Sequence, residues 1–168
     1  MPLLHNARDG ILTVSAISMN PANGAWGVIG DERGEGGLIP LWTDFDVRGQ
    51  DRILPSAMGV IAYPRRMTVT RHDLRLLVVG DIIGSTSVPE TDTDEGLEVN
   101  LEYLRANVFA PVVSATGTRA ATIGMPSGAT RSANIHVLGV KTQSYGFGEC
   151  GAIWVGTLQI SIPAGRFV

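Results

Sequence analysis

Apolar and polar positions alternate over several short runs of this chain, and clusters rich in glycine, proline or asparagine separate the runs. Successive side chains of an extended strand point to opposite faces, so each alternating run predicts a β-strand with one buried face. Residues 11–19 predict a first strand, residues 20–24 a turn, and residues 26–29 a short second strand. The charged, glycine-rich stretch 31–37 is expected to form a mobile loop.

The middle of the chain contains its longest strand candidate. Residues 68–83 predict one long strand, and the nearly continuous apolar half from Leu74 to Val79 is typical of a central strand. Ahead of it, order is expected to resume at residues 38–47, with Trp42 and Phe45 as anchors. A turn is predicted at residues 48–51. A short strand follows at residues 60–63, and Pro64 restricts it to an edge or a strand end.

A different period marks residues 94–110. An apolar stripe recurs there at helical spacing, formed by Leu97, Leu101, Leu104 and Val108, with Tyr103 and Phe109 beside it. Asp92 to Glu95 supply capping oxygens and negative charge at the positive end of the helix dipole, and Pro111 ends the helix. We therefore expect one amphipathic helix that packs on a sheet.

The last third of the chain returns to strand patterns. Residues 112–114, 120–123 and 134–142 predict three strands, and residues 143–148 predict a hairpin loop that leads into a last strand at 152–162. Five apolar residues share one face of that last strand: Ala152, Trp154, Leu158, Ile160 and Ile162. Thr157, Gln159 and Ser161 share the other face, which we expect to meet water or a partner.

These elements predict a mainly β (α+β) fold. Twenty-one glycines and nine prolines between short β-branched runs are typical of a barrel or a sandwich. The 168 residues fit a single β-rich domain that spans 1–168, with an extended N-terminal arm at 1–10. One amphipathic helix is expected to pack on the barrel or sandwich.

Composition points to a protein with large contact surfaces. Hydrophobic residues make up 44% of the chain and charged residues only 17%, which is low for a free-standing soluble protein and favours burial against other proteins. The net charge is −3, and Lys141 is the single lysine beside twelve arginines. The N-terminus has no signal-peptide pattern, and no apolar run reaches the length of a membrane span, so we expect assembly in a cytoplasm without membrane contact.

The sequence contains no pattern that predicts catalysis, a cofactor or a metal. His5, His72 and His136 lie far apart, and Cys150 has no second cysteine and no adjacent histidine. The glycine-rich stretch 34–37 lacks the lysine of a phosphate-binding loop, and Ser127 lacks the context of a nucleophile elbow. The acids at 90–102 do not match a calcium loop, and the helix dipole accounts for most of them.

Two clusters of opposite charge predict a contact between subunits. Arginines that lie on or near a turn and the next strand are expected to meet the acids of a neighbouring copy, in a head-to-tail contact that closes into a ring. The residues of this hypothetical interface are Arg48, Arg52, Arg65, Arg66, Arg71, Arg75, Glu90, Asp92, Asp94 and Glu95. The alternative is that these arginines protect a solvated sheet edge from unwanted pairing.

The stretch from Trp42 to Gly84 contains an ordered set of features. An arginine-bearing turn, Arg48-Gly49-Gln50-Asp51-Arg52, leads to Ile53-Leu54-Pro55 and Met58-Gly59, then to a pair of arginines, then to a long apolar strand that ends in glycine. This order resembles the N-terminal region of distal tail proteins and related tail-tube-fold components of long-tailed (siphovirus) bacteriophages.

The resemblance implies a tail-tube-type β-barrel with one helix on its outside, assembled as a hexameric ring. Such rings stack on the tail tube or end it, and DNA passes through the lumen. The resemblance also implies a virion protein with neighbouring tail proteins as partners and with transient, non-specific contact to DNA. Mild acidity would suit such a lumen, because attraction to phosphate would impede DNA passage.

Other functions stay open at this level. We expect no counterpart here of the large C-terminal carbohydrate-binding-type domain of distal tail proteins, so a tube component, a tail terminator or a head-tail connector are alternatives. A split-barrel flavin enzyme would need a phosphate site, for which Arg131-Ser132 and the stretch 85–87 are candidates. A carbohydrate-binding sandwich would use exposed Trp26, Trp42 or Tyr145. A hexameric mass, a yellow preparation or retention on a sugar matrix would separate these functions.

Overall fold

A computed structural model gives the fold of the chain and describes most of its length. The described residues are 12–31, 41, 47–48, 51–53, 60–62, 66–84, 88–89, 93–110, 116–125, 127–148 and 151–168. The predictions for the arm 1–10, the anchors Trp42 and Phe45, the strand 112–114 and Cys150 lie outside these residues, and so does the predicted loop 31–37 except for Asp31, which ends a strand.

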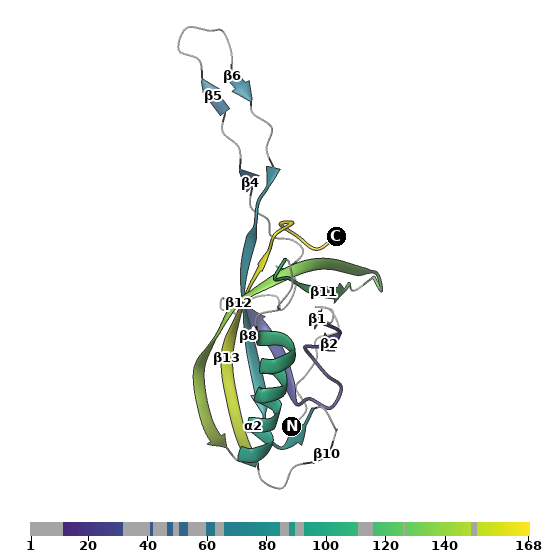
Figure 1. Cartoon of the computed structure of the whole chain (residues 1–168), viewed down its shortest axis with the longest axis vertical. Helices are drawn as coiled ribbons and strands as arrows, with labels where there is room; N and C mark the ends of the chain where they lie inside the picture. Colours follow the sequence, from purple (N-terminus) through teal and green to yellow (C-terminus); the bar gives the residue numbers. More distant parts are fainter. Residues whose placement is uncertain are drawn as a thin grey trace.

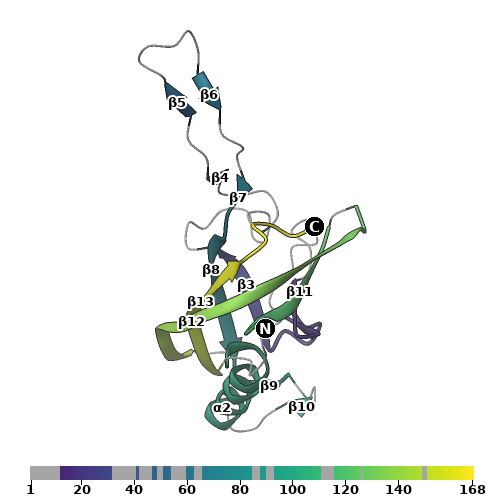
Figure 2. The same ribbon diagram turned by 45° about the horizontal axis from the view of Figure 1, so that its top comes forward.

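A seven-stranded antiparallel sheet forms the body of the protein. Its order is β2-β1-β11-β12-β13-β8-β3, and it curls into a half-barrel (Figure 1; Figure 2). The strands are β1 (Leu12–Val14), β2 (Ile17–Ser18), β3 (Trp26–Asp31), β8 (Thr70–Val79), β11 (Arg119–Gly124), β12 (Thr130–Gly148) and β13 (Gly151–Ile162). The fold is thus mainly β, as predicted.

Strand β12 makes the curl possible. Its first residues, 130–135, pair with β11, and residues 136–148 pair with β13. The register with β13 shifts between Val137 and Gly139 and again between Thr142 and Ser144. Because a β-bulge bends its strand and increases the local twist, these two shifts let one long strand belong to both halves of the curled sheet.

Three small ribbons lie outside the main sheet. Strands β4 (Val47–Arg48) and β5 (Asp51–Ile53) pair with β7 (Arg66–Met67) and β6 (Val60–Ala62), respectively, and β9 (Ile82–Ile83) pairs with β10 (Val88–Pro89). The ribbons β4–β7 and β5–β6 follow one another along an arm that extends away from the body (Figure 1; Figure 2).

The predicted helix is present, with a change of winding near its end. Helix α2 (Thr93–Leu104) continues directly into a π-helical turn, η1 (Arg105–Phe109). Leu97, Leu104 and Val108 are buried, and Leu101 is half-buried against the core, so the apolar stripe faces the sheet as expected. A π-helical turn adds one residue to the helix circumference and shifts the direction of the side chains that follow it.

The core lies between the curled sheet and α2. Strand β8 contributes Leu74, Leu76 and Val78, and β1 and β11 close the opposite side with Leu12, Val14, Ala121 and Ile123. The five apolar residues predicted to share one face of β13 are all buried. On the other face of β13, Thr157 and Ser161 are only 2% and 4% exposed, so that face is less open than its polar residues suggested.

Glycine is required at two close approaches to the core tryptophans. A side chain at Gly156 would meet the ring of Trp154 and would lie 2.8 Å from the carbonyl oxygen of Lys141, and one at Gly84 would meet the ring of Trp26. The indole rings of both tryptophans therefore pack directly on backbone, and each is held by a hydrogen bond: Trp154 Nε1 donates to Thr142 Oγ1 (3.1 Å) and Trp26 Nε1 to the Ser18 carbonyl (3.0 Å).

Two strand predictions were wrong because the chain leaves the strand within the predicted run. Residues 11–19 do not form one strand: β1 and β2 pair with each other around Ser15 and Ala16, whose φ angles are 51° and 64°. A left-handed turn of two residues preserves the period of two, so the alternating pattern cannot reveal this reversal. Residues 68–83 are also divided, since β8 ends at Val79 and β9 begins at Ile82.

One loop prediction was also wrong. Residues 143–148 continue β12, where Tyr145 pairs with Trp154. There Gly146 lies within an extended segment without ending it. The turn predicted at residues 48–51 includes residues 49–50, which lie outside the described residues.

Candidate interaction surfaces

Four strands of the sheet form a segment with two open edges. In the order β12-β13-β8-β3 each pair is antiparallel, and β3 is the last strand at its end of the sheet. At the other end, no described strand pairs with residues 136–148 of β12 on the side away from β13. Unpaired strand edges present free backbone donors and acceptors and are templates for pairing with another chain.

Helix α2 covers one face of this segment, and the opposite face carries polar residues. Side chains that alternate with the core residues point away from α2, and we call this side the reverse face. On β8 it holds Arg71, Asp73 and Arg75, and on β13 it holds Thr157, Gln159 and Ser161. Lys141 of β12 pairs with Thr157 and so lies on the same face. Within these three strands, where they pair with one another, the reverse face has three cations and one carboxylate.

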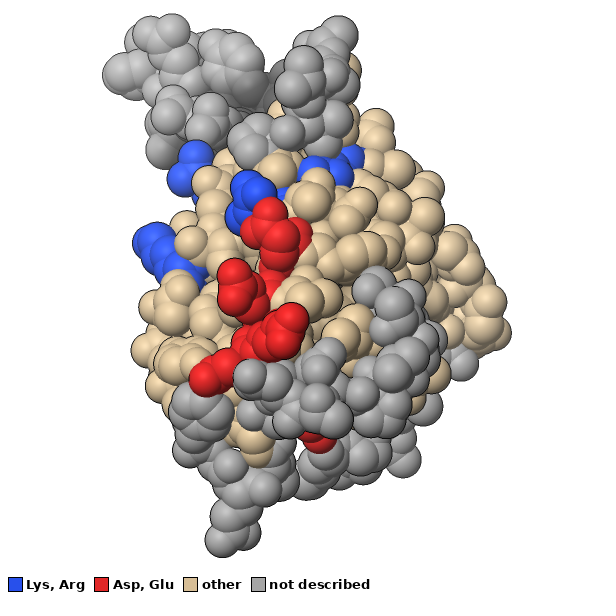
Figure 3. Space-filling model, turned by 60° about the horizontal axis from the view of Figure 1, so that its bottom comes forward, with Lys and Arg blue, Asp and Glu red and all other residues tan. Residues whose placement is uncertain are grey.

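The exposed side of α2 is acidic. Asp94, Glu95, Glu98 and Glu102 are exposed, and the acidic residues follow one another in a band across this side of the molecule (Figure 3). Acids in the first turn of a helix are stabilised by its dipole. The helix side therefore carries four exposed carboxylates, whereas the reverse face has more cations than carboxylates.

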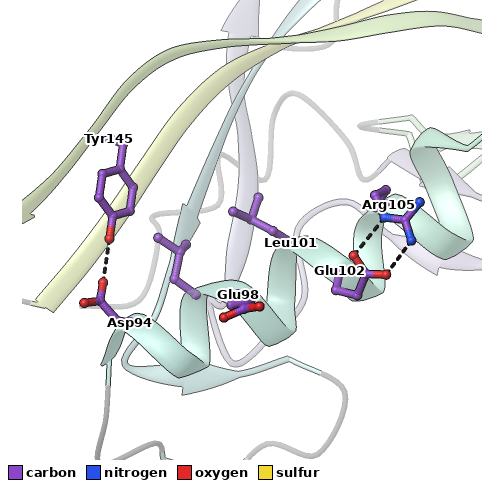
Figure 4. A pocket seen from close by; sticks show the side chains of 7 residues that line it. Asp94, Glu98, Leu101, Glu102, Arg105 and Tyr145 are labelled. Atoms are coloured by element: carbon purple, nitrogen blue, oxygen red, sulfur yellow. Dashed lines mark hydrogen bonds and ion pairs between the residues drawn. The ribbon is translucent and has the colours of Figure 1, made fainter.

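A groove of about 400 Å³ runs between α2 and the end of β12. Leu97 and Leu101 line it together with acidic side chains, and Tyr145 lies across from the start of the helix (Figure 4). The Tyr145 hydroxyl donates to Asp94 Oδ1 at 2.5 Å. This hydrogen bond, together with burial and the negative charge of Asp94, raises the pKa of Tyr145, because ionisation would break the bond and place two negative charges side by side.

An ion pair lies at the far end of this groove. Arg105 donates from Nε to Glu102 Oε2 at 2.8 Å and from Nη2 to Oε1 at 2.5 Å, a two-point pairing that fixes both side chains (Figure 4). These hydrogen bonds hold the pKa of Glu102 below its ordinary value and raise the pKa of Arg105. Both side chains are exposed, so the pair orients the groove wall more than it stabilises the fold.

A second groove of about 460 Å³ shares Leu101 and Arg105 with the first. Its other walls are apolar or nearly so: Phe109 and Ala110 from the end of the helix, Val140 and Thr142 from β12, and Trp154 from β13. The two grooves are thus neighbours along one flank of α2 and η1, above the open edge of β12. Together they are called the flank groove.

A buried asparagine holds α2 on the sheet. Asn100 is fully buried; its Nδ2 donates to the carbonyls of Val79 (2.9 Å) and Ile82 (2.6 Å), and its Oδ1 accepts from the Gly84 amide (2.9 Å). No sequence pattern described above predicted a role for this residue. Its signal was a polar residue three positions after Leu97, inside the apolar stripe.

The predicted interface residues lie in three separate places. Arg71 and Arg75 share the reverse face of β8, Asp94 and Glu95 lie in the first turn of α2, and Arg48, Arg52 and Arg66 lie on the arm strands β4, β5 and β7. Within one chain, the described arginines of this set therefore lie on other elements than the described acids. Arg65, Glu90 and Asp92 lie outside the described residues.

Among the described residues, no group of three or more histidine, cysteine or acidic side chains could hold a metal ion. Within the same residues, no helix has the length and apolar character needed to cross a bilayer. Trp26, a candidate sugar platform, is a core residue, whereas Tyr145 is exposed at the flank groove.

The architecture is that of a mainly β, curled half-barrel with one helix, and solved structures share it. No protein family and no curated protein sequence matches the chain. The Dit protein (gp 19.1) of SPP1, described as a paradigm of the hub adsorption apparatus in phages that infect Gram-positive bacteria, aligns with a TM-score of 0.54 at 10% identity, over 92% of this chain and 50% of Dit.

A chain from the baseplate of phage P2 in its activated conformation with Ca aligns equally well. Its TM-score is 0.54 at 10% identity, over 94% of this chain and 45% of the baseplate chain. The present chain therefore spans about half the length of each of these proteins. At this level of identity the two alignments establish a common fold.

Proposed function

We propose that the chain is a structural component of a long-tailed bacteriophage tail, one that forms a ring on or at the end of the tail tube and lets DNA pass. The shared fold with a phage hub protein and a phage baseplate protein supports this assignment. So does the sequence resemblance at residues 42–84. The proposed location is the virion tail, after assembly in the host cytoplasm, and the proposed role is structural rather than enzymatic.

The four-strand segment with two open edges carries the proposal. Its strands alternate in direction, so β12 at one edge and β3 at the other run in opposite senses. When a second copy places its β3 beside β12 of the first, the new pair is antiparallel as well. Repeated around an axis, four strands from each copy form a closed barrel, and closure pairs both open edges of the segment.

This arrangement assigns roles to the two faces of the segment. Helix α2 lies outside the ring, and the reverse face lines the channel. The sequence-based expectation of an acidic lumen does not fit this face, since the acids lie on α2 and the reverse face has more cations than carboxylates. Contacts with DNA in the channel are then weak, non-specific and salt-dependent.

The proposed ring keeps only part of the predicted contact between arginines and acids of neighbouring copies. Arg71 and Arg75 would face the channel, so the described arginines left for a neighbour's helix are those on the arm strands: Arg48, Arg52 and Arg66. Asp94 and Glu95, exposed at the start of α2, are the described acids that they would meet. A hexamer is the proposed ring order, with further tail proteins bound above or below it.

The mass of the purified chain tests the ring. A hexamer has about six times the mass of the 17.8 kDa chain, and light scattering after size exclusion distinguishes it from a monomer. Negative-stain images should then show rings with a central hole, and an antibody against the chain should label the tails of virions. A chain that stays monomeric at every concentration and labels no virion part would disprove the proposal.

A further inference from the structure

The two flanks of helix α2 are filled differently. On the side of β3, the rings of Trp26 and Tyr103 stack with centroids 5.8 Å apart and pack the helix against the sheet. On the side of β12 the flank groove is open, with volumes of about 400 and 460 Å³. It follows the helical segment from Asp94 to Ala110, which is roughly 24 Å long at the rise of an α-helix. The open flank is therefore long enough for several turns of a second helix.

One wall of the flank groove is a row of carboxylates. Asp94, Glu98 and Glu102 follow one another at intervals of four residues, so they lie on one side of α2, and all three line the groove (Figure 4). We call them the carboxylate row. Asp94 accepts the Tyr145 hydroxyl, and Glu102 is paired with Arg105. Glu98, between them, is exposed and makes no hydrogen bond or ion pair with another described residue, so it is the acid best placed to meet a cation.

The deeper part of the flank groove is apolar. Leu97 and Leu101 lie beside the carboxylate row. In the larger groove the apolar surface continues with Phe109, Val140 and Trp154. An apolar strip with acids along one side is complementary to a ligand that carries an apolar stripe with cations along its edge. An amphipathic helix has this pattern, and cations four residues apart on it have the same spacing as the carboxylate row.

The proposed ring leaves the flank groove accessible. Four strands from each copy, about 4.8 Å apart, separate neighbouring α2 helices by at least roughly 19 Å. The tilt of strands in a closed barrel only widens this separation. Packed helices lie about 8–10 Å apart, axis to axis, so the space between two neighbouring α2 helices admits one further helix.

We propose that the flank groove binds an amphipathic helix of another protein. Arginine or lysine side chains of that helix meet the carboxylate row, and its apolar stripe packs on Leu101, Phe109 and Trp154. The inference rests on the proposed function only in taking the partner to be another tail component. A second copy of α2 does not fit the groove, because its exposed side is itself acidic and would repel the carboxylate row.

Selection from a peptide library tests the chemistry of the ligand. A display library of peptides of about 18 residues, enough for roughly five helical turns, is panned against the purified chain. The retained peptides should carry arginine or lysine at intervals of three or four residues beside an apolar stripe. One of them, synthesised with a fluorescent label, then serves as the probe for anisotropy titrations.

A matched pair of variants locates the bound probe. Glu98→Lys reverses the charge in the middle of the carboxylate row, whereas Glu95→Lys makes the same change on the same helix outside both grooves. Glu98→Lys should raise the Kd of the probe at least about tenfold, because a cation of the probe then meets a cation of the groove. Glu95→Lys should raise it by no more than about threefold, since solvent and salt screen an exposed charge outside the contact. Thermal unfolding checks that both variants fold.

The outcomes separate this inference from the proposed function. The docking site is overturned if no peptide is retained, if the retained peptides are acidic or lack a helical period, or if the two variants raise the Kd equally. It is also overturned if Glu98→Lys instead weakens self-association, because the groove then belongs to a second copy. Rings by mass without docking leave the proposed function intact. A monomeric chain that binds the probe at Glu98 supports the docking site and contradicts the ring.

Discussion

Replacement of Asn100 by alanine is expected to destabilise the protein strongly. The substitution removes three hydrogen bonds that join α2 to the end of β8 and the turn before β10, and it leaves two carbonyls and one amide without this partner. A hydrogen bond contributes a net of about 1 kcal/mol, and a buried group left unpaired costs more than that. The three bonds together therefore predict a loss of about 3 kcal/mol.

This loss is large relative to the stability of a typical domain, which is roughly 5–15 kcal/mol. At roughly 2–4 °C per kcal/mol for a chain of this size, the melting temperature should fall by about 9 °C. Circular dichroism during thermal and urea unfolding measures both quantities. The matched control is Asn134→Ala, since Asn134 is exposed on β12, and it should change stability by less than about 0.5 kcal/mol.

A second variant separates the lost donor from the lost volume. Asn100→Asp keeps an oxygen for the Gly84 amide but points a carboxylate at the carbonyls of Val79 and Ile82. It should be at least as destabilising as alanine at neutral pH and should recover in part in acid, where the carboxyl group becomes a donor. If Asn100→Ala lost less than about 1 kcal/mol, water would be replacing the side chain and the anchoring role would be refuted.

Three further predictions concern the sheet and the groove. Gly156→Ala should lower the free energy of unfolding by about 2 kcal/mol or more, because the added methyl group meets a buried indole ring. Gly146→Ala has open space around the added methyl group and should lower it much less. Urea unfolding measures both. Asp94→Asn should lower the raised pKa of Tyr145, and an unchanged ultraviolet titration would contradict the hydrogen bond between them. The folded-state pKa of Glu102 is depressed, so its ion pair should add slightly to stability at pH values above the unfolded pKa near 4.5. This stabilisation should be lost as the pH falls through the folded-state pKa. The free energy of unfolding of Glu102→Gln should therefore differ from that of the parent at pH 7 and match it at pH 3.

Helix α2 and strand β13 could be predicted from the sequence because their signals are local. In each, a single period runs through more than ten residues, and the burial of Leu97, Leu104, Trp154 and Ile160 follows from it. The mainly β class could be predicted for the same reason. Their positions could be predicted without knowing which segments pack against them.

The turn at Ser15–Ala16 and the full length of β12 could not be predicted in this way. Both depend on partners distant in sequence: the Ser15 amide donates to the carbonyl of Ala120, and residues 143–148 are extended because β13 pairs with them. Glycine at 146 and 148 is typical of a loop, yet in an extended strand it merely removes side chains from one face of the sheet. Tertiary pairing therefore overrode the local signal.

The flank groove could not be predicted from the sequence for a related reason. Its walls come from α2, η1, β12 and β13, and its existence depends on Trp154 lying flat on Gly156 and on the π-helical turn that directs Phe109 toward β12. No single pattern in the sequence links these residues.

Net charge was the least informative feature for function. A value of −3 suggested an acidic protein, but four exposed acids lie together on α2 while Arg71, Arg75 and Lys141 lie on the reverse face. In the proposed ring these two surfaces never meet the same partner: one faces neighbouring proteins outside, the other faces the channel. Attraction to phosphate weakens as the salt concentration rises. If assembled rings retain DNA weakly at low salt, and the double variant Arg71→Gln with Arg75→Gln abolishes this retention, the reverse face faces the channel. Equal retention after neutralising those arginines would place the DNA elsewhere.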